Sequence, residues 1–128
     1  MIALESSLQK NPEMYKNIHK ALFKAYDLFE HDHETSIKDI QKYLELSEEV
    51  LETDAYGRYT PNPEINREAC VEFWNNMNTI GYIESDEDIN NYLYEDLYDQ
   101  AVAEMVEENP DNDFYKEVQK GGYGSKAQ

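Results

Sequence analysis

The sequence predicts a mainly α-helical protein: a compact bundle of four or five helices with at most a short two-stranded element. Apolar residues recur every three or four positions through most of the chain, which is the spacing of one helix face. The triplet Asn-Pro-Glu occurs at residues 11–13 and 62–64, where it combines a capping residue with a proline at the first helical position. A hydrophobic content of 40%, with 11 Tyr, 4 Phe and 1 Trp, is high enough for the chain to fold despite its many charges.

The first predicted helix begins at Asn11 and ends near Glu30, with an apolar stripe that starts at Met14. The polar run from Glu30 to Thr35 is expected to interrupt it, and Ser36 to cap the second helix. The run that starts at Ser47 is expected either to open a short third helix through Val50 and Leu51 or to continue the second helix.

Residues 53–63 contain glycine and prolines and are expected to form a connecting loop. Asn62 is then expected to open the next helix, and Gly81 to lie just past its end. The predicted organisation is an N-terminal arm at residues 1–10, one helical domain at residues 11–118 and a flexible tail at residues 119–128.

Residues 85–108, SDEDINNYLYEDLYDQAVAEMVEE, are expected to form one uninterrupted helix that Pro110 stops. At about 100° per residue, Asp88, Glu95 and Asp99 fall within a narrow arc opposite the apolar face. One side of this helix is therefore expected to pack, and the other to present carboxylates.

Charge is the strongest functional signal. Eleven Lys or Arg stand against 28 Asp or Glu, which gives a formal net charge of -17. No Lys or Arg occurs between Ala69 and Tyr115. This balance disfavours contact with nucleic acid or an anionic membrane, and it favours a partner with a basic surface.

Several other classes of function lack their signatures. Cys70 is the single cysteine, so an internal disulfide is excluded, and no histidine or asparagine pattern accompanies it as a nucleophile. The sequence shows neither a leader peptide nor a membrane-length apolar segment. We therefore expect a cytoplasmic protein that is not an enzyme, has no catalytic residue and uses no cofactor.

One polar cluster in the sequence carries the side chains that metal ions prefer. His31, His33 and three neighbouring carboxylates between Glu30 and Glu34 have metal-ligand chemistry, but a solvated loop is the favoured interpretation. The layout echoes an EF-hand pair, but Thr35 stands where glycine is needed and Gln41 where a bidentate glutamate is needed. No metal site is predicted.

Residues 69–84, ACVEFWNNMNTIGYIE, resemble the recognition helix and following turn of winged-helix proteins. Reading DNA would require basic residues there, and Arg67 is the only cation. This segment therefore supports an alternative function, a helical adaptor or assembly factor that binds a protein through an apolar patch around Trp74 and Tyr82.

Residues 93–108, LYEDLYDQAVAEMVEE, are similar to the terminal acidic helix of phage antirestriction proteins that mimic DNA, and acidic anti-CRISPR inhibitors are of the same kind. The resemblance implies a helical, often dimeric inhibitor that occupies the nucleic-acid site of a restriction or CRISPR nuclease in the bacterial cytoplasm. The main functional hypothesis is therefore a carboxylate surface that binds a basic groove, with tyrosines as anchors. The predicted partner-binding residues are Asp86, Glu87, Asp88, Tyr92, Tyr94, Glu95, Asp96, Tyr98, Asp99, Glu104, Glu107 and Glu108.

Overall fold

The structure is a computed structural model that describes residues 2–56 and 61–121. These residues form seven α-helices, one π-helical segment and one 3-10 turn, with no strand among them. The predicted mainly α-helical class is confirmed. The wing of a winged-helix fold has no counterpart in the described residues, because a wing is built from strands.

The N-terminal half contains four α-helices followed by the π-helical segment. They are α1 (Glu5–Lys10), α2 (Pro12–His31), α3 (His33–Gln41), α4 (Glu48–Leu51) and η1 (Glu52–Tyr56). The segment expected to be a loose arm thus contains α1. Tyr15 on α2 fastens α1, since its hydroxyl donates to Ser7 Oγ at 2.9 Å.

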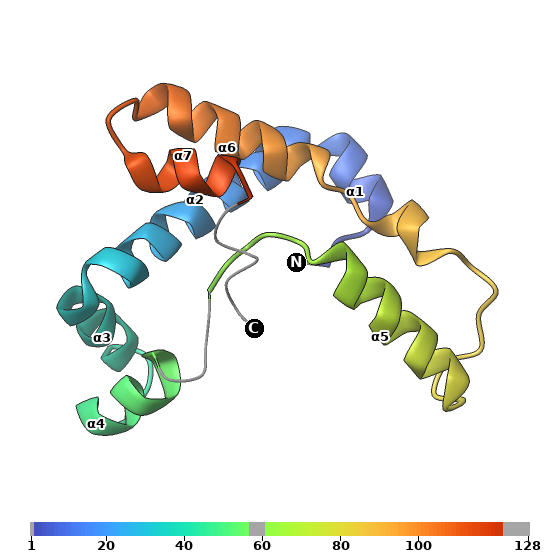
Figure 1. Cartoon of the computed structure of the whole chain (residues 1–128), viewed down its shortest axis with the longest axis horizontal. Helices are drawn as coiled ribbons and strands as arrows, with labels where there is room; N and C mark the ends of the chain where they lie inside the picture. The colour runs from blue at the N-terminus through green and yellow to red at the C-terminus, as the bar shows by residue number, and fades with distance from the viewer. Residues whose placement is uncertain (1, 57–60, 122–128) are drawn as a thin grey trace.

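The C-terminal half contains three α-helices and the 3-10 turn. They are α5 (Arg67–Thr79), η2 (Ile89–Tyr92), α6 (Asp96–Glu108) and α7 (Asp113–Gln119). Figure 1 shows α2, α6 and α7 side by side, with α3 and α4 extending from one end of this group and α5 from the other.

Local capping explains which predicted helix starts are observed. α2 begins at Pro12 as expected, and the Ser47 hydroxyl accepts from the Val50 amide at the start of α4. α3 begins earlier than predicted, because the Asp32 carboxylate caps it by accepting from the Thr35 amide. Ser36, the expected cap, is buried inside α3.

The predicted helix start at Asn62 is wrong. Its side-chain oxygen accepts from the amide of Glu64 at 2.9 Å, which closes a local turn instead of opening a helix. Asn66 is the actual cap of α5, accepting from the Ala69 amide at 2.9 Å. Gly81 follows the end of α5 with a φ of 71°, a conformation that favours glycine, as predicted.

The prediction of a single helix over residues 85–108 is also wrong. The Asp88 carboxylate accepts from the Asn90 amide, so it caps only the short turn η2. Asparagines at 90 and 91 are weak helix formers, and Leu93 is extended, with φ -96° and ψ 93°. The regular helix therefore restarts only at Asp96.

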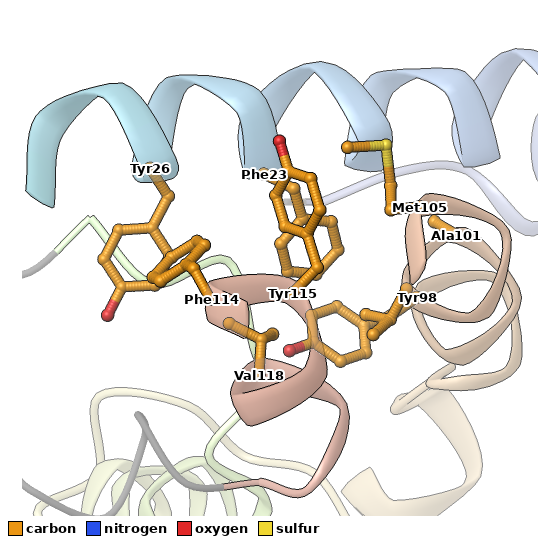
Figure 2. Close-up of a cluster of buried hydrophobic side chains, with 9 residues drawn as sticks. Phe23, Tyr26, Tyr98, Ala101, Met105, Phe114, Tyr115 and Val118 are labelled. Carbon is orange, nitrogen blue, oxygen red and sulfur yellow. The ribbon is translucent and has the colours of Figure 1, made fainter. Parts of the chain in front are cut away.

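The hydrophobic core lies between α2, α6 and α7. Phe23 and Tyr26 of α2 and Met105 of α6 are each 1% exposed. Figure 2 shows the aromatic rings of α2 and α7 gathered around one another, with Tyr26 and Phe114 edge to face at 5.1 Å between ring centroids. The buried cluster consists of Phe23, Tyr26, Tyr98, Ala101, Val102, Met105, Phe114, Tyr115 and Val118.

Ion pairs border this core where α2 meets α6. Lys16 Nζ lies 2.6 Å from Glu104 Oε1, and Lys20 Nζ lies 2.9 Å from Glu104 Oε2. Lys20 also contacts Glu108 Oε1 at 2.5 Å. Nearer the C-terminal end of α2, the side-chain amide of Asn112 donates to Asp27 Oδ2 at 2.9 Å. Polar contacts thus fix how α2 sits against the C-terminal helices.

Truncation of Met105 is expected to destabilise the fold strongly. Met105→Ala removes a fully buried side chain and leaves a cavity between α2 and α6, which costs about 2–5 kcal/mol of unfolding free energy. Tyr82→Ala, at a position that is 75% exposed, is the control and should change it by less than about 0.5 kcal/mol. Urea denaturation measures both, and equal effects would contradict this core.

Acidification is expected to weaken the fold through His19, which is 8% exposed. Burial lowers the pKa of His19 below its ordinary 6.5, so the unfolded chain takes up the proton more readily. Stability should therefore fall as pH drops below about 6.5. Glu104 weakens the fold only at a lower pH, where its carboxylate becomes protonated, because hydrogen bonds from Lys16 and Lys20 lower its pKa below 4.5.

Thermal melts between about pH 7.5 and 5.5 check this sign. His19→Gln should reduce the pH dependence in that window, whereas His31→Gln, at an exposed histidine, should leave it in place. If the melting temperature of His19→Gln falls with pH as steeply as that of the unmodified chain, another group is responsible for the loss of stability.

Candidate protein-binding surface

The outer face of α6 consists of Asp96, Asp99, Gln100, Ala103 and Glu107, and all five residues are exposed. They fall on one side of the helix because their positions repeat at three or four residues. The core residues of α6 lie on the opposite side. At 1.5 Å per residue, this outer face extends about 16 Å along the helix axis.

Three predicted partner-binding carboxylates instead form ion pairs with cations of this chain. Glu104 and Glu108 lie on the flank of α6 and pair with the lysines of α2. Glu95 Oε2 lies 3.0 Å from Arg67 Nη2. These carboxylates contribute to holding the helices together, so their substitution would alter the fold as well as the surface.

Asp86, Glu87 and Asp88 lie on the loop between α5 and η2 and are exposed. The Asp88 carboxylate accepts from the backbone and side chain of Asn90, and these bonds lower the pKa of Asp88. Glu87 Oε2 accepts from the hydroxyl of Tyr92 at 3.0 Å. The three carboxylates therefore belong to a hydrogen-bonded turn, and not to the helix predicted for them.

The three predicted tyrosine anchors have different environments. Tyr98 is 7% exposed and packs against Phe23 at 5.1 Å between ring centroids, so it belongs to the core. Tyr92 and Tyr94 are 50% and 42% exposed. A hydrogen bond to Glu87 raises the pKa of Tyr92, and partial burial beside Glu5 raises that of Tyr94. Of the three predicted anchors, only Tyr92 and Tyr94 are therefore available on the surface.

The same loop and α5 enclose a groove of about 580 Å³, here called the acidic groove. Its lining combines four carboxylates with the indole ring of Trp74, the only tryptophan in the sequence. It includes no lysine, arginine or histidine. The lining residues are Val71, Trp74, Asn75, Asn78, Ile83, Glu84, Ser85, Asp86, Glu87, Asp88 and Ile89. Trp74 is partly buried.

Hydrogen bonds hold both ends of the acidic groove. Near the end of α5, the Ser85 amide donates to Asn78 Oδ1 at 3.0 Å, and the Tyr82 amide donates to the Met77 carbonyl at 3.0 Å. At the other end, Arg67 donates to Asn90 Oδ1 and to the Leu93 carbonyl, each at 3.1 Å. These bonds join the loop that lines the groove to α5 at both ends.

The cations are largely committed to pairs within the chain. Of the nine lysines and arginines at residues 2–56 and 61–121, six lie close to carboxylates, namely Lys16, Lys20, Lys38, Lys42, Arg67 and Lys116. Most lie on α2, α3 or the start of α5. The outer face of α6 and the acidic groove therefore keep their negative charge.

The histidine cluster is drawn apart by the fold. His31 ends α2 and contacts Asp27 Oδ1 at 2.9 Å, whereas His33 begins α3 and contacts Glu52 Oε2 at 2.8 Å. Within the described residues, no three histidine, cysteine or carboxylate side chains are arranged to hold a metal ion. Cys70 is a partly buried thiol on α5.

Comparison with protein-family models, curated proteins and solved structures found no match to this chain. None of the helices in residues 2–56 and 61–121 is both long and apolar enough to cross a membrane.

Arg67 is the functional residue that sequence reasoning missed. In the sequence it is only a lone cation before an acidic region, but in the structure it joins α5 to both Asn90 and Glu95. Its isolation was the available signal, because one arginine facing many carboxylates is expected to be paired. Its partners are 23 and 28 residues away, so spacing alone does not identify them.

Removal of Arg67 is expected to loosen the acidic groove without unfolding the core. Arg67→Ala deletes three hydrogen bonds to residues 90–95. Amide hydrogen exchange should become faster in residues 83–95 and stay unchanged in the core of α2. Lys42→Ala, which deletes a surface ion pair on α3, is the control and should leave residues 83–95 unchanged. Equal exchange in both variants would show that the hydrogen bonds from Arg67 to Asn90, Leu93 and Glu95 do not hold this loop.

Proposed function

We propose that this protein is a non-enzymatic inhibitor that occupies the nucleic-acid-binding groove of a DNA-handling defence protein, such as a restriction or CRISPR nuclease, as a DNA mimic. One observation supports it most directly: the outer face of α6 and the acidic groove present carboxylates that no lysine or arginine of this chain pairs in the described residues. A basic groove complements that surface.

The arrangement of the outer face of α6 supports the same proposal. Asp96 and Asp99 are separated by about 4.5 Å along the helix axis, and Asp99 and Glu107 by about 12 Å. Charges on one strand of a DNA duplex are about 3.4 Å apart along the axis, so these separations are of the order of one to four phosphates. The helix is held rigidly by the core, which reduces the entropy lost on binding.

A second candidate, the helical adaptor, is favoured by exposed apolar side chains on α5 and just after its end. Phe73 on α5 is 63% exposed, and Ile80 and Tyr82, which follow the helix, are 72% and 75% exposed. Such a patch would bind a protein partner through contacts that tolerate high salt. Trp74, predicted to be central to this patch, lines the acidic groove instead.

Affinity capture tests the two candidates. The full chain is immobilised, incubated with a bacterial lysate, and eluted first with duplex DNA and then with salt. Mimicry predicts that the DNA step releases a nuclease or another nucleic-acid enzyme, since DNA competes for the same groove. Retention of the partner through both steps would contradict mimicry and favour the apolar patch. Light scattering on the purified chain tests the predicted dimer.

Neutralising the outer face of α6 is expected to slow association with the captured partner. The variant Asp96→Asn, Asp99→Asn, Glu107→Gln removes three charges and keeps side-chain shape, so the association rate should fall about tenfold, with a smaller dependence on salt. Glu95 is left intact, because Arg67 pairs with it. Surface plasmon resonance measures the rate.

The matched control removes three exposed carboxylates that lie outside α6, in the last turn of α2 and in or just before α4. Glu30→Gln, Glu45→Gln, Glu49→Gln changes the net charge equally but should slow association much less. Equal slowing in both variants would show that only total charge matters, and no slowing in either would place the binding face elsewhere.

A further inference from the structure

The acidic groove differs in chemistry from the outer face of α6. That face is a row of solvated carboxylates, whereas the groove combines carboxylates with apolar walls from Val71, Trp74, Ile83 and Ile89. A volume of about 580 Å³ is within the range of about 300–1,000 Å³ that is usual for ligand sites. The groove is therefore better fitted to bind a single side chain than to attract a broad positively charged surface.

Two of the four carboxylates of the groove are held by hydrogen bonds, and the other two are exposed. Glu87 is fixed by the hydroxyl of Tyr92, and Asp88 by the amide groups of Asn90. Glu84 and Asp86 lie between them and the end of α5 and are exposed. Since the groove lining contains no cation, these charges have no counterpart inside the groove. Its complement is a cation with an apolar surface.

Arginine fits these requirements better than lysine. Its guanidinium is planar, stacks on aromatic rings, donates two parallel hydrogen bonds to a carboxylate and is weakly hydrated. A lysine ammonium is compact, strongly hydrated and lacks this paired geometry. A site with an indole ring beside carboxylates is therefore expected to bind arginine more tightly than lysine.

We propose that the acidic groove receives an arginine side chain from the partner protein, stacked beside Trp74 and paired with Asp86 or Glu84. This inference rests on the proposed function, since arginines are common on the surfaces with which proteins hold nucleic-acid phosphates. The outer face of α6 then provides long-range attraction, and the groove provides a specific contact.

Trp74 makes the inference measurable, because it is the only tryptophan in the chain and its fluorescence reports on the groove. The full chain is titrated with hexa-arginine and hexa-lysine peptides at equal ionic strength. Hexa-arginine should change the emission saturably, at a concentration about tenfold lower than hexa-lysine, because only the guanidinium stacks and pairs. Equal responses to both peptides would overturn the inference.

Two matched variants localise the response. Glu84→Gln, Asp86→Asn, Glu87→Gln removes three charges from the groove and should weaken hexa-arginine binding about tenfold or more. Asp96→Asn, Asp99→Asn, Glu107→Gln removes three charges from α6 and should weaken it much less. Equal weakening in the two variants would overturn the groove as the site, and circular dichroism confirms that both are folded.

The capture experiment separates this inference from the proposed function, because it uses the partner and DNA whereas the titration uses neither. A partner released by DNA, together with no arginine preference at Trp74, would overturn only the inference. Arginine-selective binding at Trp74 without any DNA-released partner would overturn the proposed function and retain the groove as an arginine site.

Discussion

The ion pairs between Lys16 and Lys20 of α2 and Glu104 and Glu108 of α6 are the contacts on which the rest of the molecule depends. They join helices more than 80 residues apart in sequence and border the buried cluster around Met105. With 11 cations and 28 carboxylates in the chain, each cation used in this way leaves other carboxylates without a counterpart. The fold therefore concentrates negative charge on the surfaces that its lysines do not reach.

Helix α6 both stabilises the fold and presents carboxylates on the surface. Its inner face, including Tyr98 and Met105, is buried in the core, and its flank supplies carboxylates to α2. Its outer face is left with exposed carboxylates at Asp96 and Asp99. Substitutions on the flank and on the outer face should therefore have different consequences, in stability for the first and in partner binding for the second.

Helix class and several boundaries could be predicted from sequence because they depend on local chemistry. Pro12 at the start of α2 and Ser47 before α4 act within one turn. The failures also have local causes: Asn62 and Asp88 bond to amides two residues ahead, which favours turns over helices. The acidic groove could not be predicted, because the hydrogen bonds from Arg67 to Asn90 and Glu95 join residues more than 20 positions apart in the sequence.

Carboxylate footprinting with a carbodiimide and glycine ethyl ester, read by mass spectrometry, tests whether the outer face of α6 is a binding surface, since it measures which carboxylates are accessible. In the free chain, Asp96, Asp99 and Glu107 should be labelled faster than the paired Glu104. Binding of the captured partner should slow labelling of the outer face of α6 and of Asp86, and leave Glu45 unchanged. Unchanged labelling of α6 in the complex would contradict the account, because the carboxylate surface would then take no part in binding.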